Sequence, residues 1–333
     1  MSSRGSPVDG FRLAFGRHGT AGAPPVVLLH GWPGNRHDYR RVIPLLTDAA
    51  DVIVPDLRGF GGSDKHAVDV RHFYSASAQA SSVIGLINEL GLTDVVLAGY
   101  DVGSRVAQSV ARMYPELATA LVLSPPLPGV GNRVLTPQAQ REFWYQAFHQ
   151  LPLADRLIDG NLDTVRDYLR HFWSHWSGPN FALSEDDLDR VASDYALPGS
   201  FTASIAWYRA GAGMVAQSLT EPPPDRAIKI QAATDVLLPQ HAVVPTRVGR
   251  PPRRLFRRRN ASPRRRCRAL HPAGVPGRIR QPHPRPRSTQ PRRWLITSAA
   301  AIVCLAISVK RSGLRRYAGP ETLSAAITFE LAS

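Results

Sequence analysis

The stretch AGYDVGSRVA, residues 98–107, decides the fold. The segment Asp94–Gly99, which overlaps its start, is a short apolar run typical of a buried strand, and Val102–Met113 carries apolar residues at helical spacing. Asp101 therefore stands at a strand-to-helix turn between two glycines. Small residues suit a turn where strand and helix backbones pass close together, and the G-x-S-x-G nucleophile elbow is such a turn.

An aspartate replaces the serine of that motif. A carboxylate needs no base to deprotonate it, and it can attack saturated carbon, such as an epoxide or an alkyl halide, to give an ester that water must cleave. Asp101 can equally be an N-cap of the helix that follows, because Asp is favoured there. The pentapeptide alone leaves both interpretations open.

Strand-like runs and helical patterns alternate along the chain, which predicts an α/β fold with a mostly parallel sheet covered on both faces. Between residues 127 and 224 no such strand is indicated, and aromatic-rich helical stretches predict an inserted helical cap. We expect a core over 1–126, the cap over 127–224, a return to the sheet over 225–241 and a tail over 242–333. The strand-like runs are Pro25–His30, Asp51–Leu57, Val95–Gly99, Leu121–Ser124 and Ile228–Pro239, and the cap stretches are Glu142–Gln150, Leu162–Trp176 and Ser200–Ala210.

Charge is distributed unevenly over the 333 residues. Residues 242–333 hold 21 Lys/Arg and 2 Asp/Glu, whereas residues 1–241 hold 20 and 24 and carry a net charge of −4. Both cysteines, Cys267 and Cys304, lie in the basic part, so the first 241 residues suit a reducing compartment. With no signal-like N-terminus, the sequence predicts a cytoplasmic protein. The apolar run Trp294–Val309 is shorter than the ~20 residues of a membrane span, so no stable span is expected.

A second motif, His30-Gly31-Trp32-Pro33-Gly34, follows the first strand-like run. Its glycine and proline fix a turn whose backbone N–H can point inward. In elbow enzymes one amide of this loop and the amide after the nucleophile form the oxyanion hole, which assigns the donors to Trp32 and Val102. The glycine-rich loop Asp56–Asp64 lacks the Lys-Ser/Thr of a phosphate-binding P-loop, so we expect a structural role for it.

Taken together, the elbow, the His30–Pro33 motif and the Asp56–Ser63 loop resemble those of the α/β-hydrolase superfamily. An aspartate at the position of the nucleophile narrows the resemblance to its epoxide hydrolase and dehalogenase branches. The overall pattern is most similar to actinobacterial epoxide hydrolases. This resemblance implies that Tyr145 and Tyr208 hydrogen-bond the epoxide oxygen and donate its proton. Dehalogenases place Trp or Arg directly after the nucleophile, where this chain has Val102.

The resemblance thus implies hydrolysis of a small apolar epoxide by water, without a cofactor or metal ion and without nucleic acid as a partner. A haloalkane or haloacetate dehalogenase is the alternative within enzymes. A hydrolase-fold protein whose basic tail binds nucleic acid or an anionic membrane is the alternative outside them.

The family also needs a water-activating His and an acid that orients it. The resemblance puts the acid just beyond the strand Thr234–Pro239 and the His in a later G-H-F/W segment, and the sequence identifies neither. His241 and His271 stand in unrelated contexts. Read one base later, the codons for residues 242–247, 248–259 and 268–275 can spell family-like segments, which favours a frameshift near His241. In the frame as written, we expect the last strand and helix to be missing or disordered and an ester to persist on Asp101.

Overall fold

The structure is a computed structural model that describes residues 3–124, 134–177, 182–211 and 229–236. The predictions on His241, on the tail from residue 242 and on its frameshift lie outside these residues, as do those on Cys267, Cys304, His271 and the apolar run Trp294–Val309.

Within the described residues, the strands form one sheet in the order β1-β2-β4-β3-β5-β6-β7. The two strands at its start, β1 (Ser3–Arg4) and β2 (Ala14–Gly19), are antiparallel to their neighbours. The remaining strands run parallel, which confirms the predicted mostly parallel sheet: β3 (Pro25–Leu29), β4 (Asp51–Pro55), β5 (Val95–Gly99), β6 (Ala118–Leu123) and β7 (Ala233–Val236).

The register of this sheet brings the site-bearing loops to one edge. Leu29 at the end of β3 pairs with Gly99 at the end of β5, and Gly99 pairs with Leu123 at the end of β6. Parallel strands share their carboxyl-end edge, and ligands of open α/β sheets bind there. The segments that follow these residues therefore start side by side.

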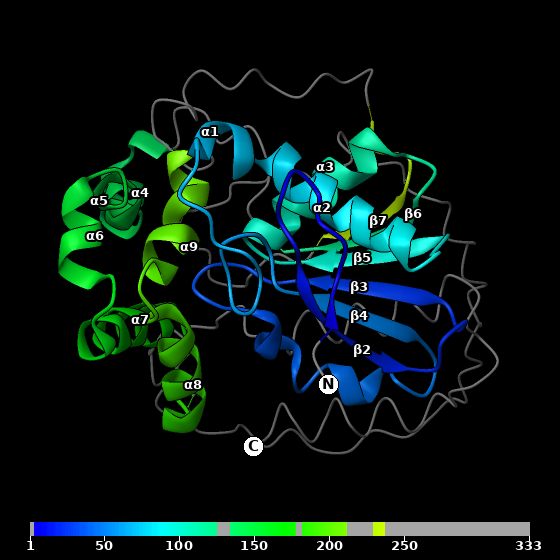
Figure 1. Cartoon of the computed structure of the whole chain (residues 1–333), viewed down its shortest axis with the longest axis horizontal. Helices are drawn as coiled ribbons and strands as arrows, with labels where there is room; N and C mark the ends of the chain where they lie inside the picture. Colours follow the sequence, from blue (N-terminus) through cyan, green and yellow to red (C-terminus); the bar gives the residue numbers. More distant parts are fainter. Residues whose placement is uncertain (1–2, 125–133, 178–181, 212–228, 237–333) are drawn as a thin grey trace, which may run out of the picture.

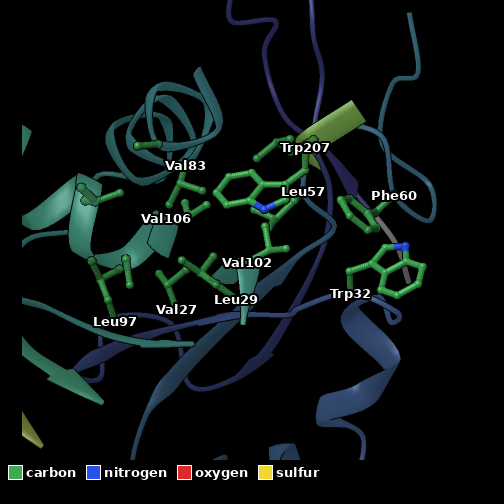
Figure 2. Packing of buried hydrophobic residues seen from close by; sticks show 14 of the residues in the cluster. Val27, Leu29, Trp32, Leu57, Phe60, Val83, Leu97, Val102, Val106 and Trp207 are labelled. Atoms are coloured by element: carbon green, nitrogen blue, oxygen red, sulfur yellow. The ribbon is translucent and has the colours of Figure 1, made fainter. Parts of the chain in front are cut away.

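Apolar side chains cover both faces of the sheet. On one face, α2 (Ala76–Glu89) and α3 (Val102–Met113) pack Val83 and Val106 against Val27 and Leu97 of the sheet, as Figure 2 shows. On the other face, Tyr39 of the short 3-10 helix Arg36–Tyr39 packs with Val42 and with the apolar strand residues whose side chains point to that face. A second 3-10 turn, Ile43–Leu45, follows in the chain.

The described helices of the cap gather on one side of the core (Figure 1). Helix α1 (Val70–Phe73) belongs to the core, and the last cap helix, α9, returns to contact it. Among the described helices, none combines the length and hydropathy that a membrane crossing requires. The cap helices are α4 (Pro137–Glu142), α5 (Trp144–Phe148), α6 (Pro152–Ile158), α7 (Leu162–Trp176), α8 (Glu185–Tyr195) and α9 (Ser200–Arg209).

The glycine-rich loop after β4 is held by its own side chains. The carboxylate of Asp56 accepts hydrogen bonds from the backbone amide of Gly62 at 2.8 Å and from the backbone and guanidinium of Arg36 at 2.9 and 2.6 Å. The fully buried Arg58 donates to Ser82 Oγ at 2.7 Å and to the carbonyl of Phe73 at 3.0 Å. Both contacts give the loop the structural role that the sequence predicts.

Candidate active site

Asp101 occupies a strained backbone position at the tip of the elbow. Its φ of 48° and ψ of −117° lie outside the regions that side-chain-bearing residues favour. It stands at the N-cap position of α3, yet its side chain makes no capping hydrogen bond. Strain of this kind persists where the surrounding structure imposes it and is concentrated at functional sites. The geometry therefore favours the nucleophile interpretation over the helix cap.

The elbow glycines are required by close backbone contacts. A Cβ on Gly99 would lie 2.5 Å from the carbonyl carbon of Gly103, and a Cβ on Gly103 would clash with the carbonyl oxygen of Leu29. A Cβ on Gly31 would lie 2.6 Å from the Cβ of Asp101. Strand β3, strand β5 and helix α3 can thus approach closely only because these positions lack side chains.

The two predicted oxyanion-hole amides meet at the carboxylate of Asp101. The amide of Trp32 donates to Asp101 Oδ2 at 2.9 Å, and the amide of Val102 hydrogen-bonds the same carboxylate. Burial raises the pKa of Asp101 to about 6, and the two amides oppose that rise because they stabilise the charged form. Asp101 is therefore largely ionised at neutral pH and only weakly solvated.

Tyr145 of α5 and Tyr208 of α9 lie together, and the charge of Asp101 acts on both phenols. Their rings are perpendicular, with centroids 5.6 Å apart, and their hydroxyl groups hydrogen-bond each other. Burial raises the pKa of both phenols, and the negative charge of Asp101 raises it further. The indole of Trp32 stacks on Tyr145 at 5.4 Å and meets Tyr208 edge-on at 5.6 Å. All five residues predicted for the site are brought together.

Comparison with known proteins agrees with this geometry. Residues 24–195 match the family model described as alpha/beta hydrolase fold, which spans the elbow, the Trp32 loop and most of the described cap. The chain belongs to this family.

Relatives of this hydrolase include epoxide hydrolases and a dehalogenase. It is 32% identical over 214 residues to the soluble epoxide hydrolase of Corynebacterium sp. (strain C12), covering 61% of this chain and 70% of that protein. It is 31% identical over 237 residues to epoxide hydrolase A of Mycobacterium tuberculosis, covering 60% and 71%. It is 30% identical over 192 residues to the fluoroacetate dehalogenase of a Burkholderia species, covering 56% and 62%.

Among solved structures, the ligand-free epoxide hydrolase CorEH matches this hydrolase with a TM-score of 0.61 at 27% identity, covering 72% of this chain and 81% of that one. These similarities place the chain in the branch of the α/β-hydrolase superfamily that contains epoxide hydrolases.

Val102, the residue after Asp101, is apolar and buried. Figure 2 shows Val102 near Leu29 and Leu57, with the indole of Trp207 close by, and all four belong to one hydrophobic cluster. Val102 contributes its backbone amide to the carboxylate of Asp101, but its side chain brings neither charge nor a hydrogen-bond donor.

Two buried histidines lie near the site. His30 is occupied on both ring nitrogens: Nε2 accepts from the amide of Leu57 at 3.0 Å, and Nδ1 lies 3.0 Å from the carbonyl of Gly31. It fixes the loops after β3 and β4. Burial lowers its pKa, so it stays neutral.

His149 is a residue that sequence reasoning missed. Its ring lies 4.8 Å from the indole of Trp32 and 5.0 Å from the ring of Tyr208. Burial lowers its pKa to about 3, Nε2 lies 3.0 Å from the hydroxyl of Tyr168, and Nδ1 has no hydrogen-bond partner. A base that works near neutral pH needs a pKa closer to 7, so His149 is a poor candidate for activating water. Only the fold brings it to Trp32, and no motif marks it.

Proposed function

We propose that this hydrolase opens an epoxide by attack of the Asp101 carboxylate on a ring carbon. The carbon–oxygen bond to Asp101 forms as the ring carbon–oxygen bond breaks, and the ring oxygen takes a proton from Tyr145 or Tyr208. The observation that carries this proposal is the convergence of an ionised, desolvated carboxylate with two buried phenol hydroxyls. Epoxide opening needs both a nucleophile and a proton donor for the oxygen that leaves carbon.

The electrostatics suit this exchange of charge. While Asp101 is ionised, its charge raises the pKa of both phenols and keeps them protonated. As the carboxylate becomes a neutral ester, that effect disappears at the moment when negative charge develops on the epoxide oxygen. The tyrosines thus become better proton donors during the step that uses them.

The position of the Trp32 amide supports the next step. It holds Oδ2, so we assign the attack to Oδ1. In the resulting ester Oδ2 is the carbonyl oxygen, and the Trp32 amide is placed to stabilise the oxyanion that forms when water adds to that carbonyl.

Cleavage of the ester requires a base and an acid that orients it. For the acid we propose Asp235, the penultimate residue of β7, which pairs with Val122 of the neighbouring strand β6. From the sequence, the acid is expected just beyond this strand, and Asp235 is not identified. No base is assigned, because His241 and His271 lie outside the described residues.

Reaction with styrene oxide, a small apolar epoxide, tests the proposed function. The chain is mixed with the epoxide, quenched with acid at short times and analysed by mass spectrometry of its peptides. We expect a single epoxide molecule attached at Asp101, no adduct in D101N, and a much slower reaction in Y208F. The Y114F variant is the control, because Tyr114 is exposed at the end of α3.

The dehalogenase alternative makes a different prediction for the same variants, tested by halide release. A halide leaves as a stable anion and needs no proton, so a dehalogenase would release halide from a haloalkane or haloacetate at equal rates in Y208F and wild type. The apolar side chain of Val102 favours the epoxide, because it offers a halide no hydrogen bond.

A further inference from the structure

Three consecutive residues of the loop after Trp32 are each held by a hydrogen bond to the cap. Trp173 Nε1 of α7 donates to the carbonyl of Pro33 at 3.1 Å. The Tyr195 hydroxyl of α8 donates to the carbonyl of Gly34 at 2.8 Å and accepts from the amide of the same residue at 3.0 Å. The side-chain amide of Asn35 donates to Asp194 Oδ2 at 2.8 Å.

The core holds the same loop from the opposite side. The carboxylate of Asp38 accepts hydrogen bonds from the amide of Asn35 and from the hydroxyl of Tyr100, the residue directly before the nucleophile. A Cβ on Gly34 would clash with that carboxylate and would lie 2.7 Å from the Tyr100 hydroxyl. Gly34 is thus confined between the partly buried Asp38–Tyr100 pair of the core and Tyr195 of the cap.

Tyr195 is the best placed of the cap contacts to fix this loop. Its hydroxyl is buried and makes both bonds to the backbone of one residue, so Gly34 can neither shift nor rotate without breaking one of them. Gly34 lies two residues from Trp32, whose amide holds Asp101 Oδ2. A helix of the cap is therefore connected to Asp101 by a hydrogen bond at each end of the short backbone segment Trp32–Gly34.

We propose that Tyr195 is a positioning residue for the oxyanion-hole amide of Trp32. Through Gly34, it couples the docking of the cap on the core to the hydrogen bond that this amide donates to the Asp101 carboxylate. Tyr195 need not touch the substrate in this role. The Trp32 amide is held in place for Asp101 only when α8 is docked on the core. An epoxide that enters under a displaced cap therefore meets a less well stabilised carboxylate. The coupling itself is a property of the folded chain, and only its catalytic consequence rests on the proposed function.

The first test titrates Asp101 in the full chain with 13C-labelled aspartate carboxyl groups, its signal being assigned by its loss in D101N. Tyr195→Phe removes both bonds to Gly34 and should raise the pKa of Asp101 by about one unit, which is the scale of one hydrogen bond to a charged group. Ser193→Ala is the matched control, because this exposed α8 residue bonds only the carbonyl of Asp189 on its own helix. It should leave the pKa of Asp101 unchanged.

Trp173→Phe is a second variant that removes the bond to Pro33, and it should shift the pKa of Asp101 in the same direction. An Asp101 pKa that is unchanged in a folded Y195F variant overturns the proposal, whatever happens to the stability of that variant. If Y195F does not fold, W173F decides alone.

The second test uses the reaction with styrene oxide. The pH midpoint of ester formation should move upward in Y195F by the same amount as the titration, while the rate at high pH changes only a few-fold. An unshifted midpoint contradicts the proposal. If wild type forms no ester at all, the proposed function fails, and the titration still decides the role of Tyr195.

Discussion

The backbone amide of Trp32 lies 2.9 Å from Oδ2 of Asp101, a residue 69 positions later in the chain. Strand β3 delivers one partner and strand β5 the other, and the pairing of Leu29 with Gly99 sets them at the same level. By stabilising the charged form, this hydrogen bond opposes the rise in the pKa of Asp101 that burial causes. The predictions below depend on this arrangement.

Ester formation should follow the ionisation of Asp101. Because burial raises the pKa of Asp101 to about 6, the reactive carboxylate is lost as the pH falls through that value. We expect the rate of adduct formation with styrene oxide to rise with pH and level off above about pH 7. Rates measured between pH 5 and 8 check this, and a flat profile over that range would mean that the carboxylate is far better solvated.

Both tyrosines should matter for the reaction with an epoxide and matter little for the reaction with an alkyl halide. Removing a proton donor costs roughly 10²-fold or more in a general-acid step, so Y145F and Y208F should each slow ester formation from an epoxide on that scale. The same variants should leave alkylation by an alkyl halide within a few-fold of wild type. Equal losses with both substrate classes would assign the tyrosines a packing role.

Gly103→Ala should disrupt the elbow. The new Cβ would clash with the Leu29 carbonyl and lie 2.5 Å from its carbon, and the backbone of a central strand cannot move aside cheaply. We expect a loss of at least about 3 kcal/mol in the free energy of unfolding, at the upper end for overpacking. Gly160→Ala is the control: its site is open and only its φ of 73° is unfavourable, so it should cost about 1–2 kcal/mol. Urea unfolding compares the two, and equal losses would refute the steric argument.

Asp38 should make the protein less stable as the pH rises. Burial raises the pKa of Asp38 to about 7, although Tyr100 and Asn35 donate hydrogen bonds to it. The unfolded carboxyl titrates near 4, so between about pH 4 and 7 the folded state binds the extra proton and stability falls as the pH increases.

The Asp38→Asn variant removes this titration. Between pH 5 and pH 8, the free energy of unfolding of wild type should fall by about 2–3 kcal/mol more than that of D38N. Urea unfolding of both proteins at the two pH values measures the difference, and parallel changes would show that Asp38 is already ionised at pH 5.

Local patterns predict much of this fold. The limits of α3 and α7 agree with the sequence expectation, because their apolar residues repeat at helical spacing between clear turn signals. Strand β2 has no such signal, since its last three residues, Arg17–Gly19, are exposed. Helix α2 is rich in Ala and Ser, so its buried face does not stand out in the sequence.

The residues of the candidate site also differ in how well the sequence predicts them. Asp101, Trp32 and Val102 belong to short motifs whose backbone geometry follows from glycine spacing. Tyr145 and Tyr208 are apolar-looking cap residues in the sequence, and only a family resemblance singles them out. His149 and Tyr195 carry no sequence signal, because their surroundings arise where the cap packs on the core.

The central claim is that Asp101 is the nucleophile, and peptide mass spectrometry of the acid-quenched chain after exposure to styrene oxide tests it most directly. We predict one epoxide molecule attached to Asp101 in wild type and none in D101N. Unconsumed epoxide with no adduct in wild type, or an adduct that persists in D101N, would contradict the account.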